Sequence, residues 1–229
     1  MDTAKFNRSL TAKNLGVRVG TPQFIVLHDT AGSGTANDAK YLANDPERRG
    51  ISVDFCIDKE GTIFQLNPNL ATRCTHHAGR NTFFRRYANR NVNNHSIGIE
   101  IAQKANMVGL NPPYPDVQVK AVAFVCRYLC ETFKLAKTDI TTHAKIITDG
   151  SRSDPRKFPW DKFWTYFNEP DDAEKEPFDT KMVHIVQAGD TLYALATKYT
   201  TTVERIKALN DMNDASNLIK VGQQLIVKE

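Results

Sequence analysis

The sequence is poor in the residues that mark specialised protein classes. Its 229 residues include only 4 Cys, 12 Gly and 10 Pro. So few cysteines exclude a small disulfide framework, and so little glycine and proline excludes collagen-like and low-complexity chains. With 41% apolar and 24% charged residues, the chain is typical of a globular protein of one or two domains.

Long apolar runs are missing as well. The longest, residues 121–130, contains Arg127 and is too short to cross a bilayer. The N-terminus lacks the apolar core of a signal peptide, because basic residues interrupt it between Lys5 and Arg18. We therefore expect no membrane insertion and a protein kept in the cytoplasm until something releases it. The four cysteines are expected to be buried, reduced thiols.

Charge is distributed unevenly along the chain. Residues 1–167 carry 23 Lys and Arg against 15 Asp and Glu, residues 168–183 carry 2 against 6, and residues 184–229 carry 5 of each. A basic block, an acidic spacer with two prolines and a neutral block indicate two domains and a linker. The expected boundaries are 1–167 for the first domain, 168–182 for the linker and 183–229 for the second domain.

Apolar periodicity predicts strands interspersed with helices in the first domain. The predicted strands are residues 24–28, 53–57, 62–66 and 97–102. The predicted helices are residues 37–43 and 119–133. Asp58–Gly61 between two of the strands is a hairpin signal. This mixture predicts an α/β fold in which helices flank a mixed central sheet.

The neutral block predicts a second, smaller fold. Short strands at 184–187 and 224–227 flank two apolar helix faces. Thr201 and Glu204 are spaced as a capping box for the second helix. The result is a β-α-α-β unit whose small core gives it marginal stability.

Two histidines and an aspartate stand where ligands converge in α/β folds. His28 ends an apolar strand, His143 lies near a second strand end, and Asp154 follows eleven residues later. Such a set leaves the fourth position of a zinc ion free for water. From the spacing alone, a structural role for these residues stays open.

Glu100 interrupts an otherwise apolar strand. A lone buried carboxylate is costly, so this residue is either held in an ion pair or used in chemistry, and both interpretations stay open. The arginines and aromatic residues between Arg73 and Arg90 are typical of a nucleic-acid surface. Attraction to another anionic polymer explains them at least as well, and we expect no nucleic-acid partner.

Five motifs in residues 24–167 carry a resemblance to a known family. They are Ile25–Thr30 (IVLHDT), Asp58–Ile63 (DKEGTI), His77–Gly79 (HAG), Asn94–Glu100 (NHSIGIE) and Asp154–Trp160 (DPRKFPW). In this order they resemble the zinc-dependent N-acetylmuramoyl-L-alanine amidases of the type-2 family, which includes amidase-type phage lysozymes and animal peptidoglycan recognition proteins. The resemblance implies that family's α/β fold and hydrolysis of the bond between N-acetylmuramic acid and L-alanine in peptidoglycan.

The resemblance also implies roles for single residues. The zinc ligands would be His28, His143 and Asp154. Glu100 matches a catalytic glutamate, and Arg152 replaces a lysine, so that its role can only be electrostatic. Thr30 and His77 would contact the substrate.

The chain departs from the family pattern at two places. Val53 and Asp54 stand where many members have a histidine preceded by an aromatic or small residue, so Glu100 would carry the proton transfer alone. His76 replaces a tryptophan, which would alter the wall of the groove and the peptide preference.

The neutral block resembles a LysM domain over its full length. The resemblance rests on His184–Leu192 (HIVQAGDTL) and on the stretch from Asn217 to Leu225. It implies a shallow groove for N-acetylglucosamine-containing glycans, contacted by Gly189, Asp190, Thr191, Leu192, Asn217, Leu218 and Ile219. Helix capping by Asp190 and Thr191, and core packing by Leu192, are the alternatives.

Together these features predict a phage endolysin that remains in the host cytoplasm until it reaches the cell wall. A bacterial autolysin of the same chemistry is the nearest alternative. A recognition protein that binds peptidoglycan without cutting it is the rival from another functional class. The oligomeric state is not predicted.

Overall fold

The computed structural model describes residues 5–104, 113–169, 182–199, 201–212 and 217–228. The chain forms two compact units, Met1–Asp171 and Asp172–Glu229. Most of the expected linker, residues 168–182, lies outside the described residues. Among the described helices, none has both the length and the apolar character needed to cross a bilayer.

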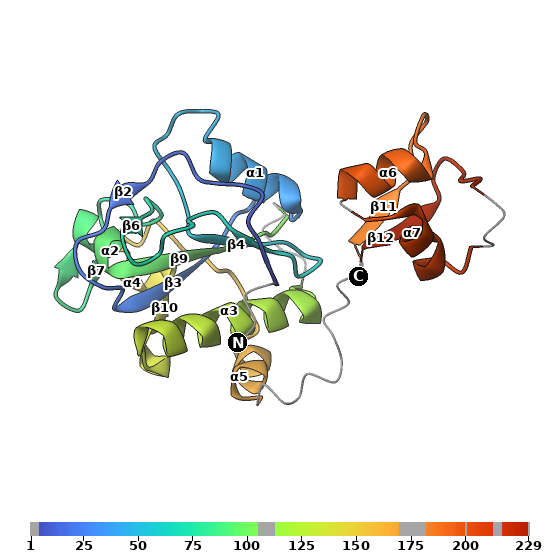
Figure 1. The fold of residues 1–229 in the computed structure, drawn as a ribbon. Coiled ribbons are helices and arrows are strands. Elements are labelled where there is room, and N and C mark those ends of the chain that lie inside the picture. Colours follow the sequence, from blue (N-terminus) through green and yellow to red (C-terminus); the bar gives the residue numbers. More distant parts are fainter. Residues whose placement is uncertain (1–4, 105–112, 170–181, 200, 213–216, 229) are drawn as a thin grey trace. The chain divides into compact units, whose positions relative to one another are not determined.

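A mixed six-stranded sheet forms the centre of the first unit (Figure 1). Its order is β1 (Phe6–Asn7), β5 (Ile63–Gln65), β4 (Phe55–Ile57), β9 (Ser96–Ile101), β3 (Phe24–Asp29) and β10 (Ile140–Thr142). All neighbours are parallel except β4 and β5, which pair as the antiparallel hairpin expected around Asp58–Gly61. The predicted mixed sheet is confirmed, although β1 was not foreseen.

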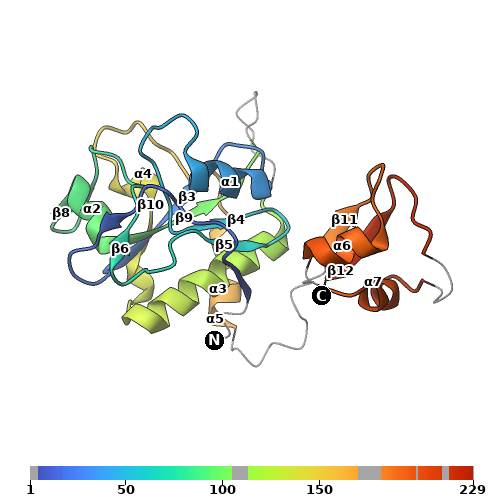
Figure 2. The ribbon, with the colours of Figure 1, turned by 45° about the horizontal axis from the view of Figure 1, so that its top comes forward.

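Helices cover both faces of this sheet. Helix α3 (Asp116–Phe133) runs along one face with α5 (Trp160–Asn168) beside it, and α1 (Ala36–Asn44) lies on the opposite side (Figures 1 and 2). The smaller elements are β2 (Gly16–Val17), β6 (Arg73–Cys74), β7 (Phe83–Phe84), β8 (Tyr87–Ala88), α2 (Arg90–His95), the 3-10 turn η2 (Lys137–Asp139) and α4 (His143–Ile146). All four cysteines are buried and free, as predicted.

The pairing of β3 with β9 decides which side chains share a face. Val26 lies opposite Gly98, and His28 lies opposite Glu100. Because side chains alternate along a strand, His28 and Glu100 project from the same face of the sheet. On that face, Phe24 and Val26 pack with residues of α2 and α4 in an apolar cluster. On this face the first halves of the strands are therefore apolar, and His28 and Glu100 lie at the carboxyl ends.

The second unit is a β-α-α-β fold, as predicted. Its strands β11 (Met182–Ile185) and β12 (Gln224–Lys228) pair antiparallel, and α6 (Leu192–Tyr199) and α7 (Val203–Leu209) lie between them in sequence. The predicted cap was wrong by one residue: Thr202 accepts the hydrogen bond from Arg205 N, at 3.1 Å. Thr201, which follows α6, instead donates its backbone N–H to Ala196 O in that helix.

Candidate metal and catalytic site

A cleft of about 580 Å³ lies at the carboxyl ends of β3 and β9. The position agrees with the rule that ligands bind beyond the carboxyl ends of parallel strands. It brings together all the residues that the sequence proposed for the first domain: His28, Thr30, His77, Glu100, His143, Arg152 and Asp154.

His28, His143 and Asp154 could hold a metal ion. The Nδ1 atoms of the two histidines are 3.0 Å apart, and Asp154 Oδ2 lies 3.3 Å from His28 Nδ1 and 3.1 Å from His143 Nδ1. A tetrahedral zinc ion with bonds of about 2.0 Å needs ligand atoms roughly 3.3 Å apart. Two imidazole nitrogens and one carboxylate oxygen at these separations fit zinc.

The local fold places each of these residues. His143 is the first residue of α4, and Thr142 caps that helix by accepting a hydrogen bond from Lys145 N. The backbone oxygen of Asp154 accepts from Ala144 N at 3.0 Å, so the loop that carries Asp154 is tied to the helix that carries His143.

A second tie was not foreseen from the sequence. The buried carboxylate of Asp29 accepts from the backbone N of Arg156 at 2.7 Å and also pairs with the Arg156 guanidinium. Asp29 directly follows His28, and Arg156 comes two residues after Asp154. The ion pair therefore fixes the third candidate ligand relative to the first. The adjacency of Asp29 to His28 was the one signal available in the sequence.

Burial and mutual contacts set the charge of the three groups. Burial lowers the pKa of His28, which favours the neutral imidazole that a metal requires. Burial by itself would raise the pKa of Asp154, but its close contacts with the rings of His143 and His28 lower it below its ordinary value. The carboxylate is therefore ionised and the His28 ring neutral near pH 7.

Glu100 has no structural ion pair among the described residues. Its Oε2 atom is buried and has no described hydrogen-bond partner. Burial, followed by the nearby carboxylates of Asp154, Asp29 and Asp38, raises the pKa of Glu100 to about 8. A bound cation would favour the ionised form. Such a group can accept and release a proton near neutral pH, which favours the chemical interpretation of Glu100 over the structural one.

Arg152 is exposed on the cleft wall. Its positive charge lowers the pKa values of both His28 and Glu100, so it acts electrostatically on the centre of the site. An arginine keeps its charge at any working pH. The arrangement offers a fixed positive charge to an anion that forms in the cleft.

The Thr30 hydroxyl is engaged within the protein. It donates to Asp38 Oδ2 at 2.7 Å and accepts from the backbone N of Gln103 and of Gly32. Asp38 also accepts from Ser33 N, so these contacts close the loop that follows β3. Contact of Thr30 with a substrate stays a prediction from the resemblance.

Asp54, one of the departures from the family pattern, is completely buried. It accepts hydrogen bonds from Asn67 Nδ2 and Thr75 Oγ1, both at 2.7 Å, and from the backbone N of Gly98 at 2.9 Å. Burial raises its pKa, while the charge of Arg18, whose guanidinium lies 4.0 Å away, lowers it. Asp54 is absent from the cleft lining. Asp54 therefore belongs to a structural network and is not a second catalytic group.

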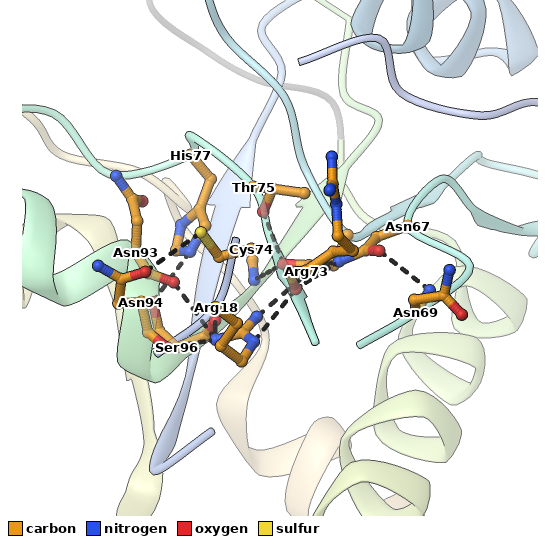
Figure 3. A network of polar contacts seen from close by, with 12 residues as sticks. Arg18, Asn67, Asn69, Arg73, Cys74, Thr75, His77, Asn93, Asn94 and Ser96 are labelled. Atoms are coloured by element: carbon orange, nitrogen blue, oxygen red, sulfur yellow. Dashed lines mark hydrogen bonds and ion pairs between the residues drawn. The ribbon is translucent and has the colours of Figure 1, made fainter. Parts of the chain in front are cut away.

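Arg18 connects that network to the site strands (Figure 3). Its guanidinium donates to Arg73 O at 3.1 Å, to Asn94 O at 2.7 Å and to Ser96 O at 2.9 Å. The segments around Arg73 and around residues 94–96 thus meet at one buried cation that Asp54 neutralises. From the sequence, Arg18 is recognisable only as one of the basic residues near the N-terminus.

His76, the other departure from the family pattern, is exposed and lines the cleft. Its Nδ1 atom lies 3.2 Å from Gly50 O. The imidazole therefore forms part of the cleft wall, as expected. Its effect on peptide preference stays a prediction.

The glycan-binding residues predicted in the second unit differ in what they contact. Asp190 Oδ2 accepts from Gln187 N and lies 2.7 Å from His184 Nε2, and Thr191 Oγ1 accepts from Ala194 N. Leu192 is buried in the core. Of the remainder, Ile219 packs partly against that core, whereas Gly189, Asn217 and Leu218 are exposed, Leu218 to 85%. A glycan role for these seven residues stays a prediction.

Comparison with known proteins agrees with this arrangement. Residues 18–157 match the family described as N-acetylmuramoyl-L-alanine amidase, and residues 184–228 match the LysM domain. The N-acetylmuramoyl-L-alanine amidase XlyA of Bacillus subtilis (strain 168) is 29% identical over 219 residues. That alignment covers 90% of this chain but only 61% of XlyA.

Two solved structures share the fold. A mutant endolysin from Bacillus subtilis has a TM-score of 0.53 at 23% identity, over 71% of this chain and 97% of that one. AmpDh3 from Pseudomonas aeruginosa, in complex with an anhydromuramic pentapeptide, has a TM-score of 0.51 at 24% identity, over 72% and 65%. At these identities the likeness shows the fold alone.

The buried network yields a first prediction. Asp54→Asn leaves the Arg18 cation without its counter-charge, and we expect the free energy of unfolding to fall by about 3–5 kcal/mol, measured by urea denaturation at pH 7. Lys162→Gln is the control, because its partner Asp116 and Lys162 itself are each 56% exposed. Breaking such a surface pair should cost less than about 1 kcal/mol. Equal losses in the two variants would contradict the structural role of Asp54.

Proposed function

The chain belongs to the N-acetylmuramoyl-L-alanine amidase family and carries a LysM domain, and from this premise we propose that it hydrolyses the amide bond between N-acetylmuramic acid and L-alanine in peptidoglycan. The observation that carries the proposal is the convergence of His28, His143 and Asp154 beside Glu100, whose carboxylate has a buried oxygen without a described partner. A site built for binding alone would have no use for such a group.

We propose zinc as the cofactor, held by His28, His143 and Asp154. A bound zinc ion would lower the pKa of a water molecule to about 7 and polarise the carbonyl of the scissile amide. The donor set and the separations of its atoms support this choice over Mg²⁺ or Ca²⁺, which prefer oxygen ligands.

In this mechanism Glu100 and Arg152 have different roles. Glu100 takes a proton from the attacking water and delivers it to the departing nitrogen of L-alanine, as a group that exchanges protons near neutral pH can do. Arg152 stabilises the negative charge that develops on the carbonyl oxygen. Its contribution is electrostatic because it keeps its proton.

The two parts of the chain would divide the work. We propose that residues 1–167 form the catalytic domain, that 168–182 form an acidic linker, and that 183–229 bind N-acetylglucosamine-containing glycan. Tethering a glycan binder to the amidase raises the local concentration of substrate. The proposed partners are thus the muropeptide and the glycan of one polymer, the bacterial cell wall.

We propose that the protein is a phage endolysin, which acts from the host cytoplasm when it is released to the wall. The amidase family joined to a LysM domain, and similarity to the amidase XlyA, support a role on the cell wall. A bacterial autolysin would perform the same chemistry. The non-catalytic recognition protein is less favoured, because such a protein needs neither the candidate ligands nor an unpartnered Glu100.

The first test of this function identifies the bond that is cut. The zinc-loaded protein is expected to release new amino groups of L-alanine from purified cell walls, detected by N-terminal labelling. A chelator should stop the reaction and added zinc should restore it. Reducing sugar ends in place of amino groups would mean a glycosidase, and wall binding without either product would mean a recognition protein.

The proton-transfer role is tested by Glu100→Gln. We expect kcat to fall by about 10²- to 10⁴-fold, because the isosteric amide cannot accept the proton. Zinc content, measured by metal analysis, should not change. Glu131→Gln is the matched control, since Glu131 is exposed on α3. Full hydrolysis by Glu100→Gln would contradict the assignment.

The glycan-binding role is tested by Leu218→Asp. Leu218 is 85% exposed, so the substitution should leave the fold intact while it weakens co-sedimentation with cell walls. Cleavage of small soluble muropeptides should be unchanged. Val19→Asp serves as the control, because Val19 is 68% exposed in the first unit and should retain full wall binding. Equal wall binding by both variants would remove Leu218 from the glycan surface.

A further inference from the structure

His77 uses both of its ring nitrogens inside the protein. Its Nδ1 atom lies 3.0 Å from His28 Nε2, and its Nε2 atom lies 2.9 Å from Ser96 Oγ. The rings of His28 and His77 meet edge to face, with their centroids 5.1 Å apart. A neutral imidazole has one donor and one acceptor nitrogen. His77 therefore has no hydrogen-bonding nitrogen left for a substrate.

The direction of every hydrogen bond in this chain of contacts follows from Ser96. Its hydroxyl donates to the backbone oxygen of Val92 at 2.5 Å, in a contact that needs the only hydroxyl proton (Figure 3 shows the His77–Ser96 contact). Ser96 Oγ must then accept from His77 Nε2–H. Consequently His77 Nδ1 is an acceptor, and His28 Nε2 carries the proton that it accepts.

This order leaves the Nδ1 atom of His28 without a proton. Nδ1 is the atom that lies 3.0 Å from His143 Nδ1 and 3.3 Å from Asp154 Oδ2. We propose that the relay from His28 through His77 and Ser96 to the Val92 carbonyl selects the His28 tautomer whose Nδ1 lone pair faces the cation. His77 is then a positioning residue and not a substrate contact. The inference rests on the proposed zinc amidase function.

The seat of the His77 ring is built into β9. A Cβ atom at Gly98 would lie 2.4 Å from His77 Cγ and 2.7 Å from Cδ2, so only glycine leaves room for the ring. The backbone N of Gly98 is in turn held by Asp54 at 2.9 Å. The buried ion pair thus supports the strand on which His77 rests.

The chain after His77 is fixed as well. Asn93 accepts from Ala78 N at 2.8 Å and donates to Ala78 O at 2.9 Å. Because both backbone groups of Ala78 are held, the backbone next to His77 cannot shift without breaking two buried hydrogen bonds. Outer partners that orient a metal-binding histidine in this way typically contribute 10- to 100-fold to metal affinity.

The experiment compares two substitutions in the full-length protein. His77→Phe keeps a ring but removes the acceptor, and zinc affinity, measured by competition with a chromophoric chelator, should fall about 10- to 100-fold. His77→Asn places an amide oxygen near Nδ1 and should recover most of that loss. His95→Phe is the control, because His95 does not line the cleft and stacks on Tyr87, and its zinc affinity should equal that of the unsubstituted protein.

A second readout needs neither metal nor activity. Long-range ¹⁵N–¹H spectra of the metal-free protein should show His28 protonated at Nε2 and bare at Nδ1, with the preference lost in His77→Phe. Ser96→Ala, which removes the acceptor of the relay and keeps the ring, should weaken the same preference. This variant serves if His77→Phe does not fold.

Three results would overturn the relay. They are a proton on His28 Nδ1 in the unsubstituted protein, zinc affinity unchanged in folded His77→Phe, and a rise in KM for muropeptide with zinc affinity unchanged. The last would restore the substrate contact implied by the resemblance. A protein that has the relay and binds zinc but cuts no amide bond would overturn the proposed function and leave the relay standing.

Discussion

The parallel pairing of β3 with β9 is the constraint on which the site depends. It sets His28 beside Glu100 and Val26 beside Gly98. A slip of one residue would turn these side chains to the opposite face, where α3 packs. The fully buried apolar residues of both strands prevent it, because a slip would also misplace every one of them. The register that builds the core therefore builds the site.

Two acids next to these strands, Asp54 and Glu100, show how surroundings separate structural groups from chemical ones. Asp54 has three hydrogen-bond donors and the charge of Arg18. Glu100 has a buried oxygen with no described partner, and its pKa is raised to about 8. A satisfied carboxylate holds segments together, whereas an unsatisfied one retains its capacity to exchange a proton. Gly98, whose backbone N donates to Asp54, lies two residues before Glu100 on β9.

Carboxylates that are not candidate ligands also hold the loops around the cleft. Asp38 closes the loop after β3, and Asp29 ties that strand to the segment that carries Asp154. Loops of this kind need such ties, because a metal site tolerates little movement of its ligands. In the second unit a carboxylate has a similar role, since Asp190 contacts His184 and Gln187. The neighbouring Leu192 belongs to the core.

Much of this architecture could be predicted from the sequence. Apolar periodicity was sufficient for the mixed sheet, the β4–β5 hairpin and the β-α-α-β unit, because local pattern reports which face of an element is buried. The order of five motifs was sufficient for the family. Local pattern is weaker at boundaries, where neighbouring residues compete for one position, and the cap of α7 was placed at Thr201 when Thr202 occupies it.

Only the tertiary structure decided which residues hold the site. Asp29 and Arg156 are 127 positions apart in the sequence, and Arg18 and Ser96, which are hydrogen-bonded, are 78 positions apart. No local periodicity records such pairings, because they arise when separate segments are packed against the same sheet. The sequence by itself determined the family, the candidate ligands and the glutamate. The orientation of the His77 ring toward His28 and Ser96 depends on its close packing against Gly98 of β9. That packing exists only in the folded protein.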